Sequence, residues 1–395
     1  MLLAISIAST DAAADRIGSS NLPASTPPLK GRIADDEKAS SVIVLGSSVG
    51  ATSNAGPTFS ETPSAFLDRA FGYAAIHSTA LGRVDFNVSL SDRLYPSLDE
   101  AYEQSIDAGL SLTRNGDGQQ TLIALTVSNG RDIEQRLMES SLMLTHAWTR
   151  GTAKPYLRAE TALLDYRDVP DPFPPFANQD DRDRVSSRGE LGLRLTLTDH
   201  VEMQVGAGLD NKHYLERYDD FGVGRDSLSL YPLIGLAYTA NAGSLRALYM
   251  PLWRTYRDPL FDDTWKHAYA VEGDYALLDD VKFFAAARYG FEETDFLIAS
   301  SAYESVVLGG VTLTVGKGSI SFAASETWRT YDDLDLVAVA REDRKLELAM
   351  TGEMPLDEHF SLNSRVSYLD YRSSFGHVGT DALTASLGLT YAATR

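Results

Sequence analysis

The chain reads Glu-Leu-Gly-Leu-Arg-Leu-Thr-Leu from Glu190 to Leu197, so that every second residue is leucine. A period of two is typical of a β-strand with one apolar face and one polar face. After a short turn at Asp199-His200 the alternation resumes and continues to Asp210. Similar segments of roughly eight to ten residues recur from residue 41 onward, and about 9–11 residues of strand cross a bilayer. The segment therefore predicts an all-β, antiparallel chain of consecutive hairpins.

Short turns and long polar connections alternate along this part of the chain. The short turns are built from Gly, Asn and Asp, as in Asn-Gly-Asp-Gly at residues 115–118, because these residues tolerate the left-handed backbone of tight turns. The long connections cover residues 168–184, 216–226, 258–266, 292–304 and 332–344. The segmentation gives about eighteen strands, with sixteen as the alternative, and each short turn follows an even-numbered strand. Short periplasmic turns and long extracellular loops predict an up-and-down transmembrane β-barrel with both ends in the periplasm.

The composition agrees with a barrel and excludes several other classes of protein. The 395 residues include no cysteine, which excludes disulfides, thiolate metal sites and cysteine nucleophiles. Mean hydropathy is -0.18, and no apolar run reaches the roughly 18 residues of a transmembrane helix. A barrel escapes such measures because only alternate residues face lipid. The net charge of -20 argues against nucleic-acid binding and against a polybasic contact with anionic lipid.

The N-terminal region differs from the rest of the chain. Residues 1–14 contain a short apolar stretch followed by Ala12-Ala13-Ala14, which resembles the end of a secretory signal peptide without its basic start. A disordered tail is the alternative. Residues 15–40 are rich in Ser, Ala, Pro and charge, and we expect a flexible lead-in. The predicted barrel domain is 41–395.

Charged residues of both signs occupy strand positions that alternate with the apolar face. We expect them to project into the lumen, where they either orient polar solutes in a transverse field or pair across neighbouring strands and hydrate the wall. The predicted lumen-facing residues are Arg83, Asp85, Asp107, Arg158, Glu160, Glu190, Arg194, Glu202, Asp210, Arg246, Glu272, Asp274, Arg288, Glu347 and Arg365. A lumen enclosed by eighteen strands is wide enough for a channel unless loops plug it.

Some strands are irregular in sequence. Pro232 and Pro251 each remove a ladder donor, so we expect bulges or bends there. Glu326 falls on the lipid face if its strand keeps register, which predicts a bulge or a position near the headgroups. The faces of the first two strands are ambiguous.

Aromatic residues recur where odd-numbered strands leave for long loops. Trp-Arg-Thr-Tyr occurs at residues 253–256 and again at 328–331, and Leu-Asp-Tyr-Arg occurs at 164–167 and 369–372. Aromatic rings with a polar edge favour the membrane–water interface, although aromatics also suit strand ends in general. The predicted aromatic girdle is Tyr166, Trp253, Tyr256, Trp328, Tyr331, Tyr368 and Tyr371.

Motifs for catalysis, metal binding or cofactor binding are missing from the pattern. The seven histidines are scattered without metal-ligand spacing. Gly222-Val223-Gly224 falls in a predicted loop, which argues against a nucleotide cradle. We therefore predict no catalytic, cofactor-binding or metal-binding residues, and a barrel-rim hydrolase stays an alternative. The external loops are acidic, and they either bridge cations to lipopolysaccharide phosphates or form a solvated surface.

Three segments together resemble the β-barrel porin families of proteobacterial outer membranes. They are Gly-Ser-Ser-Val-Gly-Ala-Thr-Ser-Asn at 46–54, Ser-Ile-Asp-Ala-Gly-Leu-Ser-Leu at 105–112, and Leu-Gly-Leu-Thr-Tyr at 387–391, before a terminus that lacks the usual final aromatic residue. The resemblance implies an outer-membrane location, contact with lipid and lipopolysaccharide, and recognition by the outer-membrane assembly machinery. It carries no site residue.

The sequence thus favours a passive porin-like channel for polar solutes or for a secreted polysaccharide. A loop-plugged surface scaffold without transport and the barrel-rim hydrolase are the alternatives. A soluble β-propeller is disfavoured, because its strands would be only about 5–6 residues long.

Overall fold

The computed structural model describes residues 41–54, 63–96, 102–131, 136–167, 182–218, 222–292, 302–331, 341–374 and 379–394. The predicted signal remnant (1–14) and lead-in (15–40) lie outside the described residues, as do parts of several long connections. No helix among the described residues is long and apolar enough to cross a membrane.

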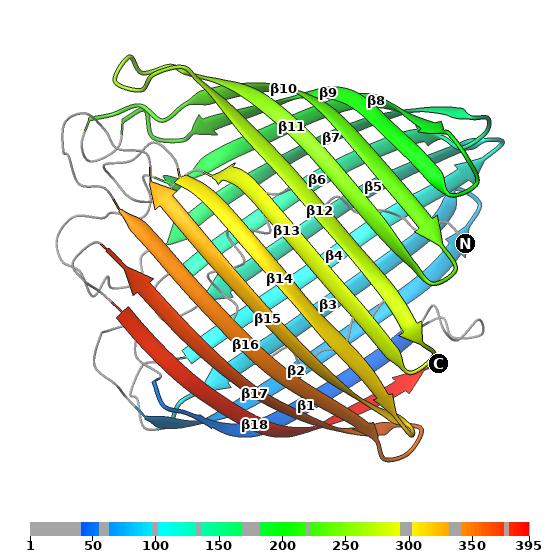
Figure 1. The fold of residues 1–395 in the computed structure, drawn as a ribbon, viewed down its shortest axis with the longest axis vertical. Coiled ribbons are helices and arrows are strands. Elements are labelled where there is room, and N and C mark those ends of the chain that lie inside the picture. The colour runs from blue at the N-terminus through cyan, green and yellow to red at the C-terminus, as the bar shows by residue number, and fades with distance from the viewer. Residues whose placement is uncertain are drawn as a thin grey trace.

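The described chain forms eighteen strands, as predicted (Figure 1). Their bounds are β1 (Ser41–Thr52), β2 (Ser64–Thr79), β3 (Gly82–Leu94), β4 (Tyr102–Gly116), β5 (Gln119–Arg131), β6 (Arg136–Trp148), β7 (Ala153–Arg167), β8 (Arg184–Thr196), β9 (Val201–Tyr214), β10 (Ser227–Ala240), β11 (Gly243–Tyr256), β12 (Thr264–Leu278), β13 (Val281–Glu292), β14 (Ala302–Val315), β15 (Gly318–Tyr331), β16 (Glu342–Pro355), β17 (Phe360–Ser373) and β18 (Gly379–Thr394).

The strands close into one antiparallel barrel. Each strand pairs with its neighbours in sequence, and β1 pairs with both β2 and β18. The closing ladder runs from Val42↔Thr394 to Thr52↔Thr384. Closure satisfies the backbone groups that an open sheet would expose at its edges, which is the condition for a sheet to span lipid. The predicted fold class is therefore confirmed.

The connections differ in length at the two ends of the barrel, also as predicted. The turn from β2 to β3 uses only residues 80–81, whereas β7 and β8 are joined by residues 168–183. Gly82, Gly118 and Gly316 in the short turns have φ of 144°, 80° and 62°, a region that glycine enters without steric cost. Val42 and Thr394 pair at the short-turn end, so both ends of the described chain lie there.

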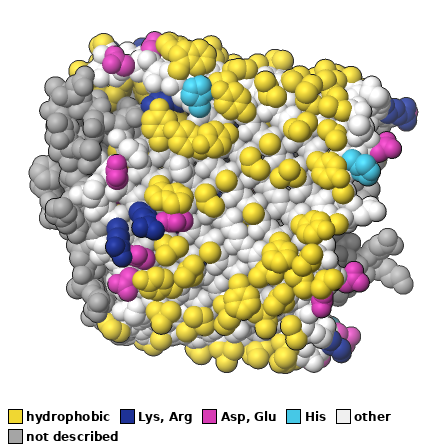
Figure 2. Space-filling model, in the orientation of Figure 1, with side chains coloured by type: hydrophobic (Ala, Val, Ile, Leu, Met, Phe, Trp, Pro, Cys, Tyr) yellow, Lys and Arg dark blue, Asp and Glu magenta, His cyan; other side chains and the backbone are white. Residues whose placement is uncertain are grey.

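The two faces of the sheet have opposite character. Directly opposed residues in neighbouring strands share a face, so the ladders assign each strand position to the inner or the outer side. Leu191 on the outer side is 65% exposed, whereas Glu190 beside it is 5% exposed. Figure 2 shows hydrophobic side chains spread over the outer wall, with charged side chains gathered toward its two ends. This is the arrangement of a barrel that faces lipid outside and water inside.

The structure corrects one expectation about irregular strands. The pairs Leu230↔Trp253 and Ile234↔Tyr249 flank the two prolines, with three residues between the paired positions on each strand. The spacing is equal on the two strands, so no residue is inserted at Pro232 or Pro251. Both prolines lack an N–H donor at the β10–β11 seam, where the ladder is interrupted between these pairs. The register shift lies instead at Ala276/Leu278, between β12 and β13.

Glu326 keeps its register and faces outward. Its ladders with β14 and β16 are continuous, so the expected bulge is not formed. The carboxylate accepts a hydrogen bond from Nε of Arg344 at 2.5 Å, on the same outer face. The ion pair lies toward the long-loop end of the wall, where charge is less costly than at mid-membrane.

Candidate functional site: the barrel lumen

The residues predicted to face the lumen share the inner side of the sheet. Arg158 is opposed to Glu190, which is buried, and Arg194 is opposed to the buried Gln204. Following the ladders strand by strand from such pairs gives the same side to the complete predicted set: Arg83, Asp85, Asp107, Arg158, Glu160, Glu190, Arg194, Glu202, Asp210, Arg246, Glu272, Asp274, Arg288, Glu347 and Arg365. Strict alternation was the signal that identified them.

Many of these charges pair locally. Within one strand, Arg83 contacts Asp85 and Arg158 contacts Glu160, both at 2.7 Å. Lys345 and Glu347 are likewise in contact within β16, at 3.0 Å. Between strands, two further contacts join Lys154 to Glu202 at 3.3 Å and Arg246 to Glu272 at 3.6 Å. Pairing of opposite charges gives a wall that is polar and hydrated, with little net field of one sign at each pair.

A buried cluster that the sequence reasoning missed braces β1 to β4. Arg93 donates from Nε to Asp68 Oδ1 at 2.7 Å, and its Nη1 lies 3.8 Å from Glu103 Oε2. Ser48 donates to Asp68 Oδ2 at 3.0 Å, and the hydroxyl of Tyr95 donates to Glu103 at 2.9 Å. Burial raises the pKa of Tyr95 above its ordinary value, so the hydroxyl stays a donor. We call these five residues the Asp68 cluster.

A signal for this cluster was present in the sequence. Arg93 lies an even number of residues after Arg83 and Asp85, so it takes the same inward face. Glu103 is likewise an even number of residues from Asp107 and shares its face. Asp68 could not be placed, because the alternation of β2 is weak on both faces.

A second buried group lies on β7 to β9. The Tyr156 hydroxyl donates to Glu190 at 2.7 Å and accepts from Nε2 of Gln204 at 2.7 Å. A Cβ on Gly192 would lie 2.5 Å from the Tyr156 hydroxyl oxygen, so only glycine leaves room for the ring. The Arg194 guanidinium stands 5.1 Å from the centre of that ring. Packed aromatic rings and charged side chains thus cover the inner side of β7 to β9.

The predicted aromatic girdle is divided between the two faces. Trp253, Trp328 and Tyr368 lie on the outer side, where Trp253 packs 5.4 Å from Trp265. The other four lie on the inner side: Tyr166, Tyr256, Tyr331 and Tyr371. Residues three apart in a strand point to opposite faces, so one Trp-Arg-Thr-Tyr segment cannot place both of its rings at the lipid interface.

The inward tyrosines at the long-loop end join arginine–carboxylate contacts. Tyr331 donates to Asp343 Oδ2 at 3.0 Å, and Arg341 donates to the same carboxylate at 3.1 and 2.8 Å. Arg341 also stacks over the Tyr331 ring at 4.5 Å and reaches the Tyr371 hydroxyl at 3.3 Å. The mouth of the lumen at the long-loop end is therefore lined here by a hydrogen-bonded polar network.

Several aspartates of the acidic loops hold the strand ends. Asp183 accepts from the backbone N–H of Tyr166 at 2.6 Å, and Asp226 accepts from that of Tyr214 at 2.9 Å. Asp258 accepts from the N–H of Gly224 at 2.8 Å. In the part of the chain that is described, no three His, Cys, Asp or Glu side chains are placed to hold a metal ion. Asp263 likewise accepts from the backbone N–H of Tyr256 at 3.2 Å.

The fold is similar to those of solved bacterial outer-membrane proteins. Pseudomonas aeruginosa OpdQ aligns with a TM-score of 0.50 and 12% identity over 90% of this chain and 99% of its own. P. aeruginosa OccK3 (OpdO) aligns at 0.47 and 13% over 93% and 99%, and the outer membrane channel DcaP of Acinetobacter baumannii at 0.49 and 10% over 89% and 96%. No family model and no curated protein sequence matches the chain. At this identity, the likeness to OpdQ establishes a shared fold.

Proposed function

We propose that the protein is an outer-membrane channel through which polar solutes cross by way of the barrel lumen. The observation that carries the proposal is the separation of surfaces: one closed wall has an apolar outer face and an inner face with charges of both signs. Such a wall stabilises water and polar solutes in the lumen while its outer side contacts lipid and lipopolysaccharide.

The alternatives lead to different observations. A secreted polysaccharide is a larger polar solute for the same lumen and requires the same conductance. A loop-plugged scaffold forms no conducting path, and a rim hydrolase turns over ester or amide substrates irrespective of conductance.

Planar-bilayer recording of the detergent-purified chain tests the proposal. A folded sample is identified first by its shift in gel mobility on boiling, and stepwise current is then expected. Complete absence of current from a heat-modifiable sample would contradict the channel.

Two matched substitutions locate the conducting path. Glu272→Gln removes an inner-face charge whose side chain is 62% exposed, and it should reduce the preference for cations. Glu326→Gln removes an outer-face charge and should leave ion selectivity unchanged. Equal effects of the two changes would place the current outside the lumen.

A further inference from the structure

Two arginines stand directly opposite each other on the outer side of the wall. Arg344 on β16 is paired in the ladder with Arg372 on β17, and their side chains are 58% and 71% exposed. Leu348 and Tyr368 are paired four residues further along the same two strands and share this face. Like charges that face each other across a ladder repel and destabilise it, so the arginine pair favours a compensating anion.

Neighbouring carboxylates compensate the arginine pair only in part. Glu326 accepts from Nε of Arg344 at 2.5 Å, and Asp370 accepts from Nε of Arg372 at 3.1 Å. Among the described residues, no acceptor lies within hydrogen-bonding distance of the Nη atoms of either guanidinium. Both side chains therefore keep donors that suit the oxygens of an anion.

Another outward arginine on the same wall shows what a complete partner looks like. Arg69 on β2 is directly opposed to Asp92 on β3. Its Nε and Nη2 both donate to that carboxylate, at 2.9 and 2.5 Å. The Arg69 side chain is 56% exposed, almost as much as that of Arg344. The two sites therefore differ in the residue that opposes the arginine, and only the arginine opposite an arginine lacks a two-point partner.

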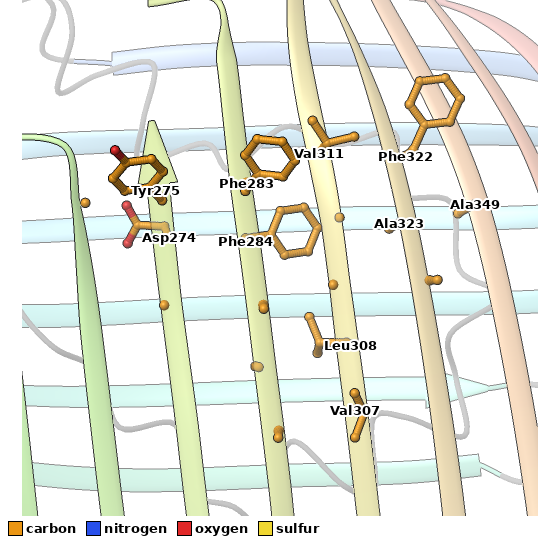
Figure 3. A pocket seen from close by; sticks show the side chains of 18 of the residues that line it. Asp274, Tyr275, Phe283, Phe284, Val307, Leu308, Val311, Phe322, Ala323 and Ala349 are labelled. Atoms are coloured by element: carbon orange, nitrogen blue, oxygen red, sulfur yellow. The ribbon is translucent and has the colours of Figure 1, made fainter. Parts of the chain in front are cut away.

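The arginine pair lies at the level of the lipid headgroups. Arg344 is close to the first residue of β16 and Arg372 to the last residue of β17, at the long-loop end. Trp328 opposes Arg344 on its other side and is 39% exposed, as is typical of the membrane–water interface. Below the pair the wall is apolar, because Leu348 and Tyr368 belong to the lining of a hollow of about 1320 Å³ (Figure 3). An anion at this level belongs to the headgroup of a lipid.

We propose that Arg344 and Arg372 together bind a phosphate group of a lipid at the long-loop end of the barrel. A phosphate accepts from both guanidiniums at once and supplies the negative charge that the opposed pair lacks. Long loops are extracellular in outer-membrane barrels, so the lipid is lipopolysaccharide, whose lipid A part carries phosphates. The site goes beyond the proposed channel, because it lies on the outer wall and takes no part in conduction.

One neighbouring charge gives the proposal a direction. Asp370 is itself opposed by Asp381 on β18, so a phosphate on the arginine pair approaches two carboxylates and is repelled by both. Asp381→Asn should therefore strengthen the binding of a phosphorylated lipid. Weaker binding in this variant would contradict the proposal, because it would mean that the acidic side chains, through a cation, hold the lipid.

Binding of lipid A to the full refolded chain in detergent micelles tests the site, with native mass spectrometry as the readout. Arg372→Gln should weaken binding about tenfold, because charge-assisted hydrogen bonds are lost. The matched control is Arg69→Gln, which also removes one exposed outward arginine and leaves its carboxylate partner in place, and it should not change binding. Both variants should keep the shift in gel mobility on boiling. Equal losses in the two variants, or no loss in Arg372→Gln, would overturn the proposal.

Two further measurements identify the group that binds and its source. Dephosphorylated lipid A should bind the wild type and Arg372→Gln equally, and a difference that persists would overturn the assignment to phosphate. Inorganic phosphate at the concentration of lipid A should not displace it, and displacement would overturn the assignment to a lipid. Conductance should be the same in the wild type and Arg372→Gln. A wild type that binds lipid A but passes no current would contradict only the proposed channel.

Discussion

The barrel wall is built differently around β1–β4 and around β12–β15. In the first region the inner positions carry the Asp68 cluster, whose charged side chains are 3% to 8% exposed and bridge three strands. In the second region Ala270 and Ala286 take inner positions of β12 and β13, the Arg329–Glu304 ion pair at 2.7 Å bridges β14 and β15, and the described β12–β13 ladder stops at Tyr269↔Tyr289. The same two-residue alternation produces both regions, so alternation fixes which face a residue takes and leaves the strength of the wall to residue identity.

The comparison has a physical consequence. Side-chain bridges hold neighbouring strands of the first region together in addition to the backbone ladder. In the second region the end of β13 is held differently, because the buried Phe291 packs with Leu252 and lies 5.1 Å from Nζ of Lys266. The ion-pair bracing near β2–β4 and the aromatic packing at the end of β12–β13 are two results of what the inner positions hold.

The largest expected effect comes from breaking the Asp68 cluster. Asp68→Asn leaves Arg93 buried with only the more distant Glu103, at 3.8 Å. Loss of one partner from a buried ion pair typically costs about 3–5 kcal/mol. We expect an unfolding free energy lower by that order, measured by urea titration of the refolded protein in lipid vesicles.

The control for this change is the next residue pair on the same two strands. Arg69 and Asp92 contact each other on the outer side, with side chains 56% and 24% exposed. Exposed pairs are worth about 0–1 kcal/mol, so Asp92→Asn should change stability little. Comparable losses from Asp68→Asn and Asp92→Asn would refute the contrast between the inner and outer faces.

The fold and the lumen face were predictable from sequence because both depend on short-range patterns. Alternation placed Arg194 and Glu347 inward, and turn chemistry set the strand number. The two tyrosines of the Trp-Arg-Thr-Tyr segments were predicted to lie at the lipid interface because of their chemistry. Their position three residues after an outward tryptophan instead places them on the inner face. The early end of the β12–β13 ladder was out of reach, since it goes with the packing of Phe291 against Leu252, on strands that are not neighbours in the barrel.

Glycine substitutions sharpen the comparison with a smaller effect. Gly192→Ala would put a methyl group 2.5 Å from the Tyr156 hydroxyl oxygen, and overpacking of this kind costs about 1–3 kcal/mol. Gly309→Ala in the β14 wall meets only a backbone oxygen of Phe284 at 3.5 Å, an ordinary contact. Gly192→Ala should therefore lower the urea midpoint, and Gly309→Ala should not. The reverse order would contradict the close packing of the Tyr156 ring against Gly192.

The smallest effect belongs to the short turn between β16 and β17, outside both regions. The Asp357 carboxylate accepts from the backbone N–H groups of His359 and Phe360, each at 2.7 Å, and these hydrogen bonds lower its pKa below the ordinary 3.8. A carboxyl whose pKa falls on folding stabilises the folded state above its unfolded pKa, and that contribution disappears as the pH falls through the folded pKa. The difference in urea midpoint between the wild type and Asp357→Asn should therefore be small and constant at neutral pH and should shrink below pH about 4. Because the turn is exposed and the wall is held by its ladders, both curves should keep the same slope, and a slope change in the variant would mean that the β16–β17 hairpin had loosened as a whole.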